Sequence, residues 1–361
     1  MSSMRGASCC AHRGVTEMAR IDLDLAHAYR PDPRADSDYA LLPLKMSFED
    51  GGAYALLGPS GCGKTTMLNL ISGLLTPSQG TVCFDGVDVT ARSPQQRNIA
   101  QVFQFPVIYD TMTVAQNLAF PLRNRGVDPA RIRERVGRIA EMLDLTPMLD
   151  RRAAGLAADA KQKISLGRGL VREDVSAVLF DEPLTVIDPH LKWQLRRKLK
   201  QIHRELRLTL VYVTHDQVEA LTFADQVVVM TRGRAVQIGT ASELFERPRH
   251  AFVGHFIGSP GMNFLPASLL PDAPAGAVRL GIRPEYLRLA QADAPGALEA
   301  QVTRLQDLGT GWLLSATLAE GSVLRARLDR STAALPPGTR VWLQVGGPHT
   351  CYYDAQEERV A

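Results

Sequence analysis

The nine residues GPSGCGKTT, from Gly58 to Thr66, decide the fold of this chain. They follow the apolar run AYALL and open the segment TTMLNLISGLL, whose apolar residues recur at helical spacing. A glycine-rich loop between a strand and a helix is a P-loop, in which backbone N–H groups and the helix dipole hold a phosphate. The pattern arises by chance in about one chain in a hundred of this size. The flanking strand and helix argue against that alternative, so we predict a nucleotide-binding α/β domain.

The P-loop predicts how the chain contacts ATP. Lys64 is expected to reach the β- and γ-phosphates, and the hydroxyl of Thr65 is expected to bind Mg²⁺. ATP and Mg²⁺ are therefore the predicted cofactors. The other loop residues that we expect to contact ATP are Gly58, Ser60, Gly61, Cys62, Gly63 and Thr66.

A second motif, AVLFDEP at 177–183, has the form of a buried strand that ends in two carboxylates. Asp181 is expected to hold the Mg²⁺ shell, and Glu182 is expected to be the general base that polarises the attacking water. The alternative is an ordinary Asp-Glu strand end. The position of the motif downstream of a P-loop favours the catalytic interpretation.

Composition indicates a globular protein with a core of ordinary size. Of the 361 residues, 45% are hydrophobic and 22% charged, and the net charge of +3 gives no reason to expect a nucleic-acid partner. No apolar run approaches the roughly 20 residues that span a bilayer, so direct membrane insertion is not expected. The five cysteines show no spacing typical of a zinc site or a disulfide framework, which fits a reducing cytoplasm.

Short apolar runs alternate with helical segments as far as about residue 240, which is typical of a parallel sheet covered by helices. A helix is predicted over Pro129–Leu145, because apolar residues between Ile132 and Leu143 recur on one face. The basic segment 189–206 is predicted to be a helix with a solvated charged face. The predicted strands are RIDLDLAH, AYALLG, TVCFDG, IAQVFQ, SAVLFDE, TLVYVTH and QVVVM.

After about Arg247 the sequence becomes turn-rich, and short strand-like runs recur without helical periodicity. The runs VRLGIR, ALEAQVTRL, WLLSATL, VLRARL and RVWLQV predict a small all-β barrel or sandwich that starts near residues 258–263. At the other end, residues 1–17 lack the apolar h-region of a secretory signal. They are predicted to be a disordered extension that carries the pair Cys9-Cys10, unless translation starts at Met18.

These motifs resemble those of the ATP-binding subunits of ABC transporters, in particular of bacterial importers for sugars and related polyols. The resemblance covers about residues 21–247 and rests on GPSGCGKTT, VFQ, LGRGLVR, LFDEPLTVID and VYVTHDQVEALTFAD, with LGIRPE extending it into the C-terminal region. It implies a P-loop NTPase domain at 18–247 with a RecA-like core and a helical subdomain at about 105–170. A linker at 248–262 and an OB-like transport-associated domain at 263–361 would follow.

The resemblance also implies an activity and an assembly. In the family, two such subunits sandwich two ATP molecules, and ATP hydrolysis is coupled to solute import. Two transmembrane permease subunits are the direct partners, and a periplasmic solute-binding protein is an indirect one. The chain would then be a peripheral subunit at the cytoplasmic face of the bacterial inner membrane.

Further site residues come from the resemblance alone. Gln104 is expected to sense Mg²⁺ and the γ-phosphate, and the adjacent Phe105–Asp110 is expected to receive a helix of a membrane subunit. His215 is expected to contact the γ-phosphate and orient the water, and Asp188 to lie in a loop that crosses to the partner subunit. Tyr29 occupies about the position of the aromatic residue that stacks on adenine, with a core or turn tyrosine as the alternative.

The chain departs from the family at its signature motif. The family's Leu-Ser-Gly-Gly-Gln is replaced here by Leu156, Ala157, Ala158, Asp159 and Ala160. In the family this motif binds the γ-phosphate on the partner's P-loop. Ala157 has no hydroxyl to donate, and Asp159 brings a carboxylate toward a polyanion, where like charges about 4 Å apart cost about 4 kcal/mol at an effective dielectric of about 20. The cost would be relieved if Asp159 turned away and capped its own helix.

The chain is thus intact in what it contributes to its own ATP and altered in what it contributes to its partner's ATP. This predicts one half of an asymmetric pair, completed by a second ABC ATPase with a consensus signature. The variant resembles one of the two ATPase subunits of proteobacterial glycerol or glycerol-3-phosphate importers, which implies such a solute. An importer ATPase for another sugar or polyol is an alternative. A non-hydrolysing scaffold subunit is another, which the altered signature favours and Glu182 and His215 oppose.

Overall fold

The structure is a computed structural model that describes residues 19–185 and 187–360. The predicted extension 1–17, the pair Cys9-Cys10 and the alternative start Met18 lie outside the described residues. The chain divides into two compact units, each built from separate segments of sequence. Among the described residues, the first unit comprises 19–29, 43–53 and 65–212 except 186, and the second comprises 30–42, 54–64 and 213–360.

The first unit contains strands of two sheets. One sheet is antiparallel with the order β2-β1-β4-β5, and its register places Leu23 opposite Val82. In the other sheet β8, β7 and β6 are neighbours, and the parallel pair β6 and β7 places Val102 opposite Phe180. The bounds are β1 Ile21–Ala28, β2 Tyr39–Phe48, β4 Gln79–Phe84, β5 Val87–Asp88, β6 Ile99–Val102, β7 Ala177–Asp181 and β8 Leu210–Thr214.

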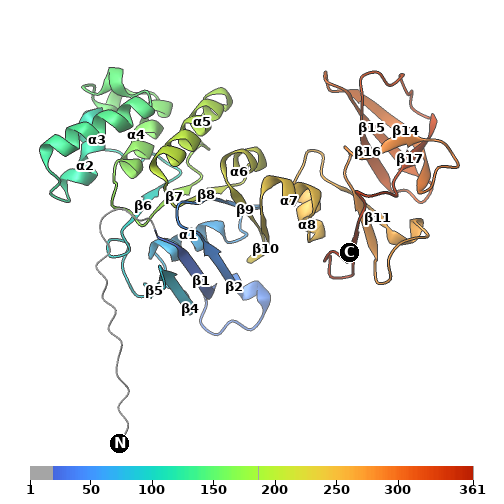
Figure 1. Cartoon of the computed structure of the whole chain (residues 1–361), viewed down its shortest axis with the longest axis horizontal. Coiled ribbons are helices and arrows are strands. Elements are labelled where there is room, and N and C mark those ends of the chain that lie inside the picture. The colour runs from blue at the N-terminus through green and yellow to red at the C-terminus, as the bar shows by residue number, and fades with distance from the viewer. Residues whose placement is uncertain (1–18, 186, 361) are drawn as a thin grey trace, which may run out of the picture. The chain divides into compact units, whose positions relative to one another are not determined.

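The longer helices belong to the first unit as well. Helices α2, α3 and α4 pack on one another as one group, drawn in green in Figure 1. The bounds are α1 Lys64–Ser72, α2 Val114–Arg123, α3 Pro129–Met142, α4 Ala158–Leu170 and α5 Pro189–Leu206. The predicted helix at 189–206 is therefore confirmed, with Leu195, Leu199 and Ile202 on its buried face.

Helix α3 starts where the sequence predicts and ends earlier. The Asp128 side chain caps it by accepting hydrogen bonds from the N–H groups of Ala130 and Arg131. The helix ends at Met142 rather than at the predicted Leu145. The physical reason is Asp144, whose φ of 54° is left-handed and stops the helix.

The second unit contains a group of three neighbouring strands. Strands β10, β9 and β3 are neighbours, and parallel pairing places Leu57 of β3 opposite Val229 of β9. The bounds are β3 Ala53–Leu57, β9 Gln226–Thr231, β10 Arg234–Gly239, α6 Gln217–Phe223, α7 Ala241–Glu246 and α8 Ala251–Phe256. The segment 248–262, predicted as a linker, therefore contains a short helix.

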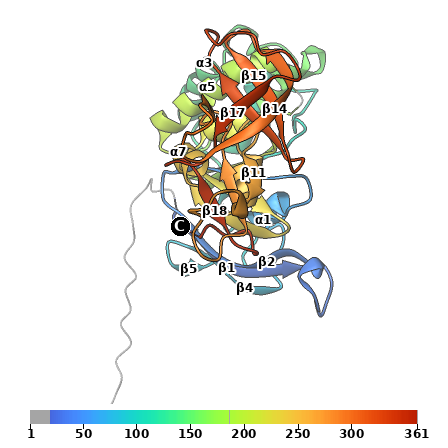
Figure 2. The ribbon, with the colours of Figure 1, turned by 90° about the vertical axis from the view of Figure 1, so that its right-hand side faces the viewer.

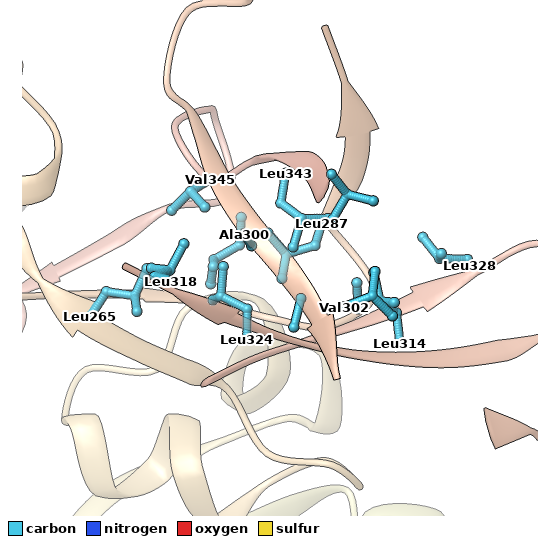
Figure 3. Packing of buried hydrophobic residues seen from close by; sticks show 14 of the residues in the cluster. Leu265, Leu287, Ala300, Val302, Leu314, Leu318, Leu324, Leu328, Leu343 and Val345 are labelled. Carbon is cyan, nitrogen blue, oxygen red and sulfur yellow. The ribbon is translucent and has the colours of Figure 1, made fainter. Parts of the chain in front are cut away.

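The C-terminal part of the second unit is all β, as predicted. It has a three-stranded sheet, β11-β12-β18, and a five-stranded sheet, β13-β17-β14-β15-β16, which is seen from another side in Figure 2. The leucines and valines that alternate along these strands form a common core (Figure 3). The bounds are β11 Asn263–Pro266, β12 Arg279–Ile282, β13 Arg288–Ala290, β14 Ala297–Asp307, β15 Trp312–Leu318, β16 Val323–Leu328, β17 Arg340–Gln344 and β18 Cys351–Tyr353.

A buried arginine links this β region to α7 and α8 through hydrogen bonds. Arg283 is 1% exposed and follows β12. Its guanidinium donates to the carbonyls of Phe245 and Ile257 at 2.6 Å each, and it lies 3.9 Å from the centre of the Phe245 ring. These bonds satisfy carbonyls that the two helix ends leave open, which is why a buried cation is stable there.

Candidate nucleotide site

The loop between β3 and α1 takes a shape that requires glycine. Gly63 has a φ of 103°, and a Cβ added to it would lie 2.6 Å from the Ala40 carbonyl oxygen. A Cβ on Gly58 would lie 2.3 Å from the carbonyl oxygen of Met230. Both glycines are therefore dictated by close backbone approaches that fix the course of the loop.

The side chain of Lys64 is held along this loop. Lys64 is 6% exposed, and its Nζ donates to the carbonyls of Gly58 at 2.9 Å and Pro59 at 3.0 Å. Cys62 is buried beneath the loop, and burial raises the pKa of its thiol. The loop thus carries an ammonium group next to a thiol that stays protonated at neutral pH.

The start of α1 meets the end of β7 within the first unit. The hydroxyl of Thr65 donates to the Asp181 carboxylate at 3.3 Å. The neighbouring Thr66 is buried, and its hydroxyl shares a 3.0 Å hydrogen bond with the Tyr29 hydroxyl. Tyr29 is 65% exposed, so its ring is not a core residue. Four of the predicted site residues therefore form two contacting pairs at one helix N-terminus.

Glu182 follows Asp181 in a strained conformation. Its φ is 46°, in the left-handed region that a residue with a side chain occupies at a cost of about 1–2 kcal/mol. Its carboxylate accepts a hydrogen bond of 3.3 Å from the hydroxyl of Thr185. Thr185 could not be found from the sequence, because a threonine two residues after a proline carries no pattern of its own.

In the second unit, His215 follows the buried strand β8 and is exposed. The residues around it form a network of their own. The hydroxyl of Thr214 donates to the buried Glu219 at 2.9 Å and accepts from the N–H of Asp216 at 3.0 Å. Asp216 in turn caps α6. This network fixes the backbone on both sides of the histidine.

Gln104 is half-buried in the segment that follows β6. The residues after it are bonded to α4. The N–H of Val107 donates to the Ser165 hydroxyl at 3.3 Å, and Lys161 pairs with Asp110 at 3.1 Å. Three apolar side chains of this segment remain open to solvent, with exposures of 68% for Phe105, 53% for Val107 and 41% for Tyr109. An apolar surface is thereby attached directly to the helix that carries the altered signature.

The altered signature forms the N-terminus of α4. Ala157 is the N-cap residue and has no side-chain cap bond. Asp159 is half-buried and lines a small hollow with Lys163 and Lys198, both of which also pair with Asp144. Two lysine side chains thus line the same hollow as Asp159, and the expectation that Asp159 caps this helix is not met.

Gln162 is a residue that the sequence analysis missed. It lies one turn into α4, is fully buried, and donates through Nε2 to the Pro183 carbonyl at 2.6 Å. This bond joins the signature helix to the loop that holds Glu182. The available signal was a polar residue on the apolar face of a helix, but only the fold shows which carbonyl it meets. Asp188 caps α5 by accepting from the N–H of His190 at 2.9 Å.

In the described part of the chain, none of the helices is both long and apolar enough to cross a membrane. A family model described as ABC transporter matches residues 41–185, and a TOBE domain model matches residues 280–350. A sn-glycerol-3-phosphate import ATP-binding protein of Rhizobium johnstonii is 42% identical over 75% of this chain and 80% of its own length. A trehalose import ATP-binding protein of Mycobacterium tuberculosis is 40% identical over 86% of this chain and 85% of its own length.

Among solved structures, cbiO1 of Clostridium perfringens, part of the ABC transporter complex cbiONQ, aligns with a TM-score of 0.57 and 26% identity. The alignment covers 64% of this chain and 92% of that chain. Together with the family matches, it confirms the predicted α/β P-loop fold followed by a small OB-like β domain. The chain belongs to the ATP-binding proteins of ABC transporters, a family of ATPases, and carries a TOBE domain in its C-terminal region.

Proposed function

We propose that this chain binds ATP with Mg²⁺ on the loop 58–66 and hydrolyses it to drive solute import. The observation that carries the proposal is the contact between Thr65 and Asp181, with Glu182 next in sequence. A hydroxyl and a carboxylate offer the oxygen ligands that Mg²⁺ prefers, and phosphate oxygens complete such a shell. Among the described residues no group of three His, Cys, Asp or Glu side chains could hold a metal ion. A site shared between the chain and its nucleotide fits this donor set.

The proposed division of labour follows from the chemistry of each group. Lys64 neutralises charge on the β- and γ-phosphates, while Thr65, Gln104 and Asp181 are the ligands proposed for Mg²⁺. The N–H groups of Gly58, Ser60, Gly61, Cys62 and Gly63, with Thr66, surround the phosphates. Bound Mg²⁺ would withdraw charge from the phosphate oxygens. Tyr29, which is 65% exposed, offers its ring to the adenine base.

Glu182 is proposed as the general base. Its carboxylate would take a proton from the water that attacks the γ-phosphorus, as the bond to the β-phosphate oxygen breaks and ADP leaves. The left-handed backbone supports this role, because strain of this kind gathers where a side chain must be aimed. His215 would hold the same water and the γ-phosphate, and Asp188 would approach the partner subunit.

Coupling to the membrane is proposed to pass through Phe105–Asp110. Exposed apolar side chains on this segment suit a helix of a permease subunit. The bonds of Val107 and Lys161 would carry a displacement there into α4. Two such permease subunits, and a periplasmic solute-binding protein beyond them, are the proposed partners. The chain would lie at the cytoplasmic face of the inner membrane.

The proposed solute is glycerol-3-phosphate or glycerol. Its support is the name of the 42% identical relative, and the trehalose protein at 40% makes another sugar or polyol the competing proposal. Uptake of labelled glycerol-3-phosphate, glycerol and trehalose should be compared in cells with and without this chain. Loss of trehalose uptake alone would overturn the glycerol proposal and leave the ATPase proposal intact.

The pairing of the subunits is a separate proposal. The altered signature at Leu156–Ala160 supports an asymmetric pair with a consensus-signature ATPase. The comparisons give this pairing no support, since the names of these relatives describe no pair of different subunits. Asp159 lines the same hollow as Lys163 and Lys198, whose positive charges would lower the expected repulsion and make a homodimer the serious alternative.

Light scattering behind a sizing column decides between the two pairings. The Glu182→Gln chain should hold ATP without cleaving it, so a stable sandwich accumulates. A monomer with bound Mg-ATP supports the asymmetric pair, and a clean ATP-driven dimer overturns it. The scaffold alternative needs another assay, because Glu182→Gln should abolish transport if the chain hydrolyses ATP and leave transport unchanged if it does not.

A further inference from the structure

The ring of Tyr29 is largely open to solvent. It is 65% exposed, and its hydroxyl bonds to Thr66 at 3.0 Å. The ring also contacts His27, which lies two residues earlier in β1, the strand that ends at Ala28 just before Tyr29. The two ring centres lie 4.9 Å apart at an angle of 87°, an edge-to-face arrangement.

His27 is an unusual residue to bury. It is 7% exposed, and neither ring nitrogen has a hydrogen-bond partner of good geometry in the described structure. Burial lowers the pKa of the imidazole, and the nearby Thr76 backbone opposes this only in part, so the ring is neutral at pH 7. Burying a polar ring without such partners is unfavourable, and the ring makes an aromatic contact with Tyr29.

The backbone between the two rings is fixed as well. The N–H of Ala28 donates to the Ser78 hydroxyl at 3.0 Å, and that hydroxyl donates to the Ala26 carbonyl at 3.1 Å. These bonds fix the strand end that carries His27, and the residue after it that leads to Tyr29. The Thr66 bond then fixes the far end of the tyrosine above α1.

We propose that His27 is a positioning residue that holds the Tyr29 ring as a platform for the nucleotide base. This rests on the proposed function, in which Tyr29 stacks on adenine. His27 touches neither base nor phosphate, and its effect passes through the angle of the tyrosine ring. The inference predicts that removing His27 weakens binding of the base and leaves binding of the phosphate chain unchanged.

The test compares two probes on the full chain by equilibrium titration. Mg·AMP-PNP carries a base and a triphosphate, whereas tripolyphosphate with Mg²⁺ carries no base. Tyr29→Ala should weaken AMP-PNP binding about tenfold, and His27→Ala about fourfold. Neither change should alter tripolyphosphate binding. His27→Phe keeps an aromatic edge against Tyr29 and should bind AMP-PNP within about twofold of the unchanged chain. It also stands in if His27→Ala fails to fold.

His203 provides a matched control. It is a histidine of α5 with 8% exposure, so His203→Ala removes a similarly buried imidazole and should weaken neither probe. If His27→Ala weakens both probes equally, its role is only structural and the inference is wrong. If Tyr29→Ala weakens AMP-PNP binding but His27→Ala does not, Tyr29 still contacts the base, and the inference that His27 positions it is wrong. If Tyr29→Ala has no effect, the proposed role of the tyrosine itself fails.

Discussion

Helices α1 and α4 begin in contrasting ways. The residues before α1 are rich in glycine, and the first turn carries Lys64 and Thr65, each held by hydrogen bonds. The residue before α4 is Ala157, which caps nothing, and the first turn carries the acidic Asp159. Both N-termini present free backbone N–H groups, but only the first is shaped for an anion. A helix N-terminus is therefore not a phosphate site by itself. Whether it can bind an anion depends on the loop before it and on the charge of its first turn.

The first prediction concerns ATP turnover at the site beside α1, where we expect the largest change. Glu182→Gln should lower ATP turnover by about 10²–10⁴-fold, because the attacking water loses its base. Binding of ATP should persist, since the change leaves Lys64 and Thr65 in place. Phosphate release and ATP binding by the purified chain measure the two effects. The control is Thr185→Val, which removes only the hydrogen bond to Glu182 and should have a much smaller effect on turnover.

The second prediction concerns the altered signature at the N-terminus of α4. A chain with Ala157→Ser, Ala158→Gly and Asp159→Gly regains the serine and glycines of the family motif. ATP-driven self-association should increase about tenfold, less than a full like-charge cost, because Asp159 already lies beside lysines. Light scattering in the Glu182→Gln background measures this. Unchanged association would show that the altered signature is not what limits pairing.

The third prediction concerns the shape of the loop before α1. Gly63→Ala should destabilise the fold by about 2 kcal/mol, because a left-handed φ is combined with a backbone clash. Gly61→Ala is the matched control, since its φ is 77° but no atom lies within 4 Å of the added Cβ. It should cost about 1 kcal/mol. Urea unfolding of both variants gives the difference, and equal losses would mean that the close approach to Ala40 is unimportant.

The last prediction concerns the N-cap position of α4, where we expect the smallest change in stability. Ala157→Ser adds an N-cap hydroxyl and should stabilise the chain by about 1 kcal/mol. Ala158→Ser, one residue later, is inside the helix and should give no gain. Thermal unfolding measures both. A gain from neither variant would indicate that solvent already satisfies these N–H groups equally well.

Much of the fold was open to prediction because its signals are local. Buried strands such as β7 and β8 appear as short apolar runs, and the P-loop is recognisable because only glycine permits its backbone. The small β domain was visible in the same way, as short strand-like runs without helical periodicity. Helix α8 escaped prediction, since six residues after a proline carry too little periodicity to stand out.

In the candidate site, too, some features follow from local sequence and others do not. The sequence by itself determined the residue types of the phosphate loop and the two carboxylates after β7, since their chemistry depends on neighbours in the chain. The fold alone shows that Asp159 shares a hollow with two lysines, that Gln162 meets the Pro183 carbonyl and that Tyr29 contacts both Thr66 and His27. Those contacts join residues far apart in sequence or depend on the direction of a side chain. Such directions are set by packing, which no local pattern encodes.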